Sequence, residues 1–226
     1  RNLIESNPCD KLEFPTTKKV LPKHMTEEEC LQFLNTINGP MSERDYCIIV
    51  VFLNSGIRLS ELCGINLRDI QDDGRVVIRG KGRKERIIYF NEACHDAIAE
   101  YQASKEVFFE GKSYDHNALF LTHVGKRIGP RGIENIIKKR MDAAGFGGRG
   151  LSPHKLRHTA ATIMYQRSKD IRALKDILGH ENLSTTQIYT HVSNEQVKNV
   201  MTTNPIAAKR EPKVNKDDDS KISTTE

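Results

Sequence analysis

Residues 44–54, RDYCIIVVFLN, constrain the fold of this chain more than any other segment. Apolar side chains occupy nearly every side of a helix over this stretch, which predicts a central, buried helix. Gly56 follows, and glycine often ends a helix in the left-handed conformation. Arg58 then stands just past a rigid core element, which is a good place to hold a functional side chain.

Capping residues and apolar periodicity predict the other helices. Thr26 caps a helix to about Ile37, and Glu27, Glu28 and Glu29 fill its first turn. Asn91 caps a helix to about Ser104, and Ser152 with Pro153 starts another in the favoured arrangement. Further helices are expected over 59–65, 130–143, 170–178, 184–189 and about 194–202.

Two short runs rich in β-branched residues, 75–79 and 86–90, flank a turn that contains Gly80 and Gly82. This arrangement predicts a β-hairpin with Lys81 at its tip. The segment 118–122, ALFLT, is expected to form a further short strand. The predicted fold class is therefore α+β and mainly α-helical, with a small β-hairpin or sheet.

The chain divides into three parts by composition. Residues 1–23 contain Pro8, Pro15 and Pro22 without an apolar period, which is typical of an interdomain linker. Residues 24–203 are expected to form one folded domain, and 204–226 a disordered tail with almost nothing to bury. The chain begins with Arg1 rather than methionine, so we expect a fragment that lacks a preceding piece.

Basic residues cluster in two stripes, although the net charge is only +5. Such stripes are typical of a surface that binds a phosphate backbone, and a merely solvated surface is the alternative. Each stripe contains a single acidic residue, Glu85 in the first and Glu134 in the second. The basic residues are Arg75, Arg79, Lys81, Arg83, Lys84 and Arg86 in the first stripe, and Lys126, Arg127, Arg131, Lys138, Lys139 and Arg140 in the second.

Composition excludes several classes of protein. The mean hydropathy of −0.55 fits a soluble protein, and no apolar run approaches the roughly 20 residues that span a bilayer. The five cysteines form no C-x-x-C motif, which argues against a disulfide framework or a zinc ribbon. A reducing cytoplasm is therefore the expected compartment.

Six side chains form a constellation with a definite chemistry: Arg58, Lys81, His154, Arg157, His180 and Tyr189. They supply a phenol nucleophile, acid and base candidates, and cationic donors for a charged phosphorane. No carboxylate cluster that could hold a metal accompanies them. The set predicts phosphoryl transfer to tyrosine on DNA.

Each role has a competing, purely structural interpretation. Tyr189 is the expected nucleophile, although a lone tyrosine on a helix is more often a half-buried aromatic. Arg58 and Arg157 would bind the non-bridging phosphate oxygens, because the guanidinium fork matches phosphate. A surface ion pair is the alternative for each, and Glu61 lies three positions after Arg58.

The proton-transfer roles go to lysine and histidine. Lys81 is the expected general acid for the leaving 5′ oxygen, with Lys84 on the same turn as its competitor. His154 could accept the tyrosine proton, and His180 could donate to a phosphate oxygen. His154 and His158 also have zinc-ligand spacing, but no third ligand is evident, so His158 is expected to pack or hydrogen-bond behind Arg157.

Four segments carry a family resemblance: SGIRLSEL, GKGRKER, HKLRHTAAT and ILGHENLSTTQIYTHV. They resemble segments of the tyrosine recombinases, also called the phage integrase family. Their residues are similar in particular to those of bacterial Xer-type and transposon integrases. The resemblance covers about residues 24–203 and fills all six active-site positions. It favours Lys81 over Lys84, and it implies that Glu61 is a supporting acid beneath the active site. The N-terminal DNA-binding domain usual in this family is expected to be missing, with only its linker present.

The resemblance implies a site-specific DNA recombinase that cleaves and rejoins DNA through a 3′-phosphotyrosyl intermediate, without metal, ATP or another cofactor. The implied partner is double-stranded DNA in the bacterial cytoplasm. A homotetramer is also implied, in which each protomer passes its C-terminal helix, about 194–202, to a neighbour. Its apolar stripe would either dock on that neighbour or fold back on its own core, and it comprises Val197, Val200 and Met201.

Three other functions compete with recombination. A type IB topoisomerase would use the same pocket to cut and reseal one duplex without strand exchange. A DNA-binding regulator would keep the fold and the basic stripes without needing Tyr189. A metal-dependent nuclease would require the carboxylate cluster that this sequence lacks.

Overall fold

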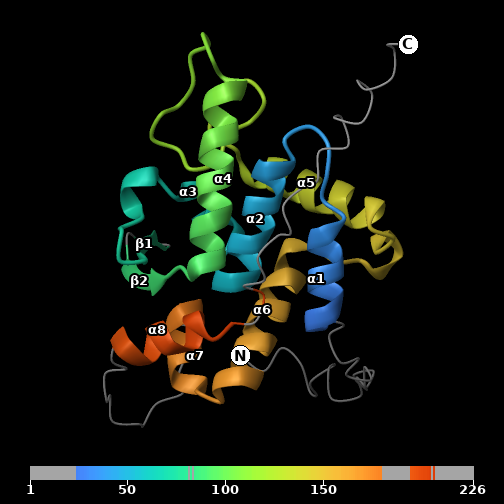
Figure 1. Ribbon diagram of the computed structural model, residues 1–226. Helices are drawn as coiled ribbons and strands as arrows, with labels where there is room; N and C mark the ends of the chain where they lie inside the picture. Colours follow the sequence, from blue (N-terminus) through green and yellow to red (C-terminus); the bar gives the residue numbers. More distant parts are fainter. Residues whose placement is uncertain (1–23, 81, 83, 180–193, 205, 207–226) are drawn as a thin grey trace, which may run out of the picture.

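The computed structural model describes residues 24–80, 82, 84–179, 194–204 and 206. Its central element is α2 (Ser42–Ser55), in which every side chain from Asp45 to Ser55 is buried, as the apolar pattern predicts. Helices α1 (Glu27–Asn35), α4 (Glu92–Phe108), α5 (Pro130–Ala143) and α6 (Pro153–Ser168) all contact α2 (Figure 1). The core of the domain is therefore built around one helix.

The predicted caps form at the beginnings of the helices. The Thr26 hydroxyl accepts a hydrogen bond from Glu29 N, and the Glu29 carboxylate accepts one from Thr26 N. Asn91 caps α4, and Ser152 followed by Pro153 caps α6. These interactions are local in sequence, which is why they are predictable. Helix α4 continues four residues past its predicted end at Ser104.

The hairpin is confirmed, with a shift of one residue in its second strand. Strands β1 (Arg75–Arg79) and β2 (Glu85–Tyr89) are antiparallel, with Val77 opposite Ile87. The strand predicted at 118–122 is wrong, because this segment makes only the isolated bridges Asn66–Ala118 and Leu121–Arg127. Its apolar side chains are nonetheless buried, Leu119 and Phe120 in the main core and Ala118 and Leu121 in a smaller cluster with Phe109. An apolar run can therefore be buried without forming a ladder.

Helices α3 (Leu59–Gly64), α7 (Ile171–Leu178) and α8 (Asn194–Thr202) complete the described helical framework. Helix α8 packs against α6, α7 and β2 of its own chain (Figure 1). Its stripe is 7% exposed at Val197, 3% at Val200 and 1% at Met201. In this structure the stripe therefore packs on its own core. This arrangement is the alternative to docking on a neighbouring chain.

The packed core extends beyond residue 203, the end predicted from composition. Asn204 Nδ2 donates to Leu53 O at 3.3 Å, and Asn54 Nδ2 donates to Ile206 O at 3.5 Å. Ile206 is 1% exposed, so this segment adds an apolar side chain to the core as well as hydrogen bonds. The predicted linker 1–23, the helix at 184–189 and the rest of the tail lie outside the described residues.

Within the part of the chain that the structure describes, no helix has both the length and the apolar character needed to cross a bilayer.

Candidate active site

The C-terminal end of α2 forms a corner on which α6, α7 and α3 converge. Gly56 ends α2 in the left-handed conformation, with φ of 58°. A Cβ atom at Gly56 would lie 3.1 Å from Leu178 Cδ2 and 3.2 Å from Met164 Cε. The absence of a side chain at this position therefore lets α6 and α7 approach the end of α2 closely.

Arg157 projects from α6 into this corner. Its Nη1 donates to Gly56 O and its Nη2 donates to Leu178 O, both at 2.7 Å. Burial, followed by the positive charges of Arg58 and Arg86, lowers the pKa of Arg157 to about 10. The guanidinium thus lies in a partly desolvated and strongly positive environment, which favours an anionic ligand.

Arg58 lies at the N-cap of α3 and pairs with Glu61 one turn later. Glu61 accepts hydrogen bonds from Arg58 N at 2.8 Å and from Arg58 Nη1 at 3.1 Å. The second fork nitrogen, Arg58 Nη2, donates to Gly179 O at 2.8 Å. The Arg58 side chain is 44% exposed and that of Glu61 is 2% exposed. The ion pair anticipated from the spacing is therefore present, but its acid is buried.

Arg86 on β2 is the site residue that sequence analysis missed. Its Nη1 and Nη2 donate to the two Glu61 carboxylate oxygens, each at 2.8 Å, and its Nε donates to Ile177 O at 2.9 Å. The sequence identified it only as part of a basic stripe. A usable signal exists, because alternation along β2 puts Arg86 on the same face as the buried Ile88.

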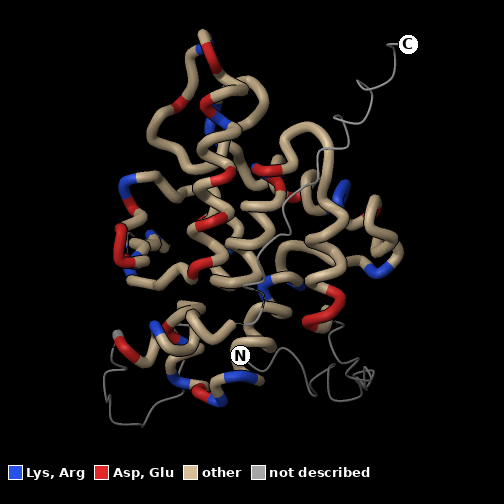
Figure 2. The backbone as a smooth tube through the Cα atoms, in the orientation of Figure 1, with Lys and Arg blue, Asp and Glu red and all other residues tan. Residues whose placement is uncertain are grey.

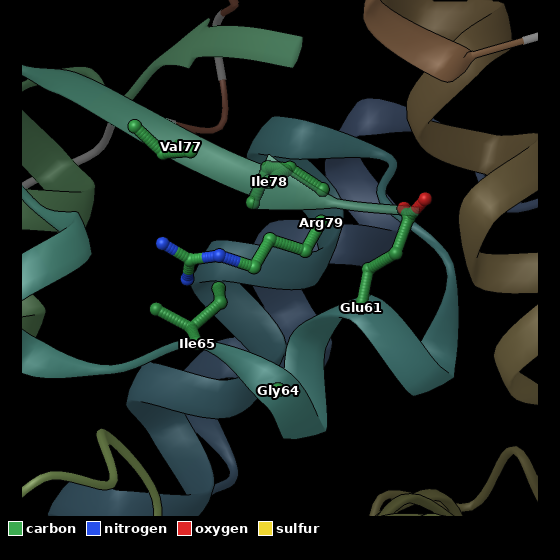
Figure 3. A pocket seen from close by; sticks show the side chains of 6 residues that line it. All are labelled: Glu61, Gly64, Ile65, Val77, Ile78 and Arg79. Carbon is green, nitrogen blue, oxygen red and sulfur yellow. The ribbon is translucent and has the colours of Figure 1, made fainter. Parts of the chain in front are cut away.

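Opposing effects act on the Glu61 carboxylate. Burial raises its pKa, while hydrogen bonds from Arg86 and from the backbone of Arg58 lower it, and the net result is a lowered pKa. Glu61 is therefore a buried, ionised group that is held by two arginines. Figure 3 shows it rising from α3 toward the end of β1, beside a small pocket lined by Glu61, Gly64, Ile65, Val77, Ile78 and Arg79.

The last turn of α7 brings the three arginines together. Arg86, Arg157 and Arg58 donate to three successive carbonyl groups, those of residues 177, 178 and 179. The final carbonyls of a helix lack partners within the helix and carry its negative dipole end, so cationic donors suit them. Gly179 has φ of 63°, and a Cβ there would lie 3.2 Å from Arg86 Nη1 and 3.3 Å from Arg58 Nη1.

The structure thus brings together two of the six predicted residues, Arg58 and Arg157. His154 lies exposed on the first turn of α6, one turn before Arg157. His158 packs edge-on against His24, with the ring centroids 5.9 Å apart. Its pKa is lowered by burial and then by His24 and His154. Among the described residues, no group of three or more histidine, cysteine or acidic side chains could hold a metal, so the zinc alternative gains no support.

Lys81, His180 and Tyr189 lie outside the described residues. Two of them directly follow described glycines of the cluster, Gly80 and Gly179. A Cβ at Gly80 would lie 3.6 Å from Glu61 Oε1, and Gly80 N donates to Lys84 O at 2.8 Å. The start of the hairpin turn therefore lies beside the same carboxylate that holds Arg58 and Arg86.

Internal ion pairs and hydrogen bonds engage several cations of the two predicted basic stripes. Arg79 pairs with Asp69 at 2.7 Å, and Arg140 pairs with Asp45 at 2.7 Å in the core. Arg127 donates to the carbonyl groups of residues 63 and 65. Figure 2 shows acidic residues close to basic ones around the hairpin. Four basic residues of the second stripe remain exposed at its surface: Lys126, Arg131, Lys138 and Lys139.

The fold and this cluster together define a mainly helical domain in which helix ends converge on a cluster of arginines. Comparison with known sequences gives the family. The chain belongs to the phage integrase family, whose family model matches residues 23–196.

Curated relatives carry the description tyrosine recombinase XerC. The relative from Caldanaerobacter subterraneus subsp. tengcongensis is 47% identical over 206 residues, which cover 91% of this chain and 57% of the relative. The one from Halalkalibacterium halodurans is 38% identical over 206 residues, covering 88% of this chain and 68% of the relative. Measured against the first of these, the chain spans little more than half the length of a relative that it matches.

Solved structures agree with this assignment. The XerA recombinase is 30% identical with a TM-score of 0.65, covering 81% of this chain and 64% of that chain. The XerH site-specific recombinase bound to difH substrate shares the fold, with 23% identity and a TM-score of 0.62 over 72% of this chain and 48% of that chain.

Proposed function

We propose that this chain acts as the catalytic domain of a site-specific DNA recombinase, which cleaves and rejoins DNA through a 3′-phosphotyrosyl intermediate without metal or ATP. The observation that carries the proposal is the convergence of Arg58 and Arg157 on the end of α7, directly before His180 in the sequence. Membership of the phage integrase family, and relatives described as tyrosine recombinases, support it.

The arginine cluster suits the scissile phosphate. Three guanidinium groups, from Arg58, Arg86 and Arg157, surround one carboxylate, Glu61, which leaves an excess of positive charge. Arg58 is the most exposed of the ion-paired arginines in the cluster and reaches solvent. Fixed donors of this kind stabilise the charge that develops on a phosphorane, and they do so without reorganisation during the reaction.

The proposed chemistry consists of two phosphoryl transfers, one that cleaves a DNA strand and one that rejoins it. The Tyr189 phenolate attacks the phosphorus, the bond from phosphorus to the 5′ oxygen breaks, and a 3′-phosphotyrosyl bond forms. His154 accepts the phenol proton, Lys81 donates a proton to the leaving 5′ oxygen, and His180 donates a hydrogen bond to a phosphate oxygen. A 5′ hydroxyl from a second duplex then attacks the phosphotyrosine and releases the tyrosine.

Double-stranded DNA is the proposed partner. The exposed cations on and before α5, Lys126, Arg131, Lys138 and Lys139, form the surface that would lie against the phosphate backbone. We propose that the chain forms a homotetramer on DNA, in which α8 moves from its own chain to a neighbour. The apolar stripe of α8, with its seat on α6, α7 and β2, supplies a surface that any identical copy could occupy.

Covalent trapping tests the proposed function. The wild-type chain and its Tyr189→Phe variant are incubated in EDTA with a pool of nicked suicide duplexes with randomised arms, and adducts are separated under denaturing conditions. We expect a denaturant-stable adduct for the wild type alone. An adduct with Tyr189→Phe would refute the nucleophile. DNA binding without any adduct would favour the regulator, and relaxation of one supercoiled plasmid without exchange would favour the topoisomerase.

A further inference from the structure

Arg86 connects three elements of the site although it is not among the six predicted residues. It extends from β2, binds both oxygens of Glu61 on α3, and donates to Ile177 O in the last turn of α7. These groups are 25 and 91 residues away from it in the sequence. Arg86 is thus the described side chain through which the hairpin, α3 and α7 are joined at this corner.

The contacts of Arg86 lead directly to Arg58. Glu61 holds Arg58 twice, through its backbone N–H and through Nη1, while Arg86 holds Glu61 in a bidentate pair. Bidentate pairing fixes the plane of a carboxylate as well as its position. The orientation of the exposed Arg58 guanidinium therefore depends on Arg86 through one buried intermediary.

A second line of contacts leads from Arg86 to the end of α7. Arg86 holds the carbonyl of residue 177, and Arg157 and Arg58 hold the next two. The position of Gly179, the last described residue before position 180, depends on this turn staying in place. Both lines converge on the residues that would contact the phosphate.

Arg86 itself is poorly placed to bind a substrate. Its side chain is 18% exposed, against 44% for Arg58, and each of its three nitrogens already donates to a protein oxygen. We infer that Arg86 is a positioning residue for strand cleavage, which holds Arg58 through Glu61 and holds the last turn of α7. This inference rests on the proposed function, and it assigns to Arg86 no contact with DNA.

Single-turnover cleavage at saturating suicide DNA tests the inference. We expect Arg86→Gln to slow adduct formation by about 10²-fold, the scale of losing one oriented donor, with DNA affinity changed by less than about threefold. Arg86→Lys keeps the charge but loses the fork, so we expect a partial recovery. The matched control is Arg149→Gln, because Arg149 also donates from both Nη atoms to the two carboxylate oxygens of one acid, Glu29 on α1. Equal losses in Arg86→Gln and Arg149→Gln, or a loss confined to DNA affinity, would overturn the inference.

Two further readouts separate positioning from general damage. In Arg86→Gln, Glu61 loses its bidentate partner and burial raises its pKa, so the rate should fall at a higher pH on the acid side than in the wild type. Glu61→Gln and Arg86→Gln should also be non-additive, with the double variant within about threefold of the worse single variant. If the losses were additive and the rate fell at the same acidic pH as in the wild type, Arg86 would not act on Arg58 through Glu61.

Hydrogen exchange provides a readout that does not require activity. Measured well below the unfolding temperature of each variant, amides in peptides covering α3 and the last turn of α7 should exchange at least about tenfold faster in Arg86→Gln than in the wild type. Arg149→Gln should leave the α7 peptide unchanged. If the wild type forms no adduct, the proposed function fails, and exchange still decides whether Arg86 positions these elements; unchanged exchange in Arg86→Gln would refute it.

Discussion

At position 157 the choice of arginine follows from what the side chain must reach. Its fork spans two carbonyl oxygens that belong to different helices, at Gly56 and at Leu178. A lysine ammonium is a single point charge, so it cannot reproduce this planar pattern and remain oriented toward a phosphate. Burial in a positive environment adds a reason, because a lysine there would lose its proton more readily than arginine does.

Replacing Arg157 by lysine tests this account. We expect Arg157→Lys to slow adduct formation in single-turnover trapping by about 10²–10³-fold, because an oriented donor to the developing charge is lost. The control is Arg167→Lys on the same helix, since Arg167 is 50% exposed and pairs with Glu27 near the surface. The control should change the rate by less than about threefold. A lysine variant as active as the control would show that the fork is not needed.

The ionisation of Glu61 predicts how the stability of the protein depends on pH. The pKa of Glu61 is lowered in the fold, so Glu61 stabilises the folded state at pH values above its unfolded pKa, which is near the usual value of 4.5. That stabilisation is lost as the pH falls from there through the folded pKa. We expect the free energy of unfolding to fall less steeply between about pH 5 and pH 3 in Glu61→Gln than in the wild type, as measured by urea denaturation. Identical slopes in the two proteins would contradict an ionised, arginine-held Glu61.

Among single residues, the sequence revealed Arg58 and Arg157 but not Arg86. Arg58 and Arg157 stand at recognisable local positions, the end of a buried helix and a helix face with spaced histidines. Arg86 acquires its role from partners that are far away in the chain. Within its own segment it is one of several cations, and only the tertiary structure shows which of them faces inward.

Among the elements, the starts of helices were predicted from local sequence, whereas the end of α4 and the structure of residues 118–122 depend on packing and were not. Helix starts follow from side chains that cap the nearest N–H groups, and these predictions are confirmed at Thr26, Asn91 and Ser152. Helix α4 extends past its predicted end because Lys105 is buried in the fold, with its Nζ 5.9 Å from the ring centroid of Tyr101. The false strand at 118–122 has the same origin, since an apolar run is buried equally well without a ladder.

The left-handed conformation of Gly179 at the end of α7 can be tested by substitution. Gly179→Ala would force an L-residue into the left-handed region and push a Cβ against Arg58 and Arg86. Gly39→Ala is a matched control, because Gly39 has φ of +80° but nothing within 4 Å of its Cβ position. We expect both variants to lose about 1 kcal/mol of unfolding free energy from the backbone conformation. Only Gly179→Ala should also lose cleavage activity, by about tenfold or more. Equal rates for the two variants in single-turnover trapping would show that the arginines do not depend on this turn.

For the whole molecule, the proposed assembly of several chains depends on whether α8 stays on its own chain or moves to a neighbour. The helix contributes buried side chains to its own chain, and Tyr89 N lies 3.2 Å from Met201 Sδ in that contact. An exchange between identical chains would break this contact in one copy and rebuild it in another, so the packing energies largely cancel. The balance would then be set by DNA, which would bring neighbouring copies close enough to compete.

Cross-linking can distinguish the two positions of α8. Asp73 lies before β1 and is near enough to Lys198 on α8 for their charges to interact. In an Asp73→Cys, Lys198→Cys variant treated with a short bis-maleimide, we expect an intrachain link in the free protein. With cleavable DNA present, we expect interchain links that give a ladder up to four chains, because α8 of one protomer then occupies the seat of the next. The control pair Asp73→Cys, Val107→Cys places the second thiol on exposed α4 and should give no ladder. Assemblies that sediment as tetramers on DNA but yield only intrachain links would show that α8 stays on its own core, and that another surface holds the protomers together.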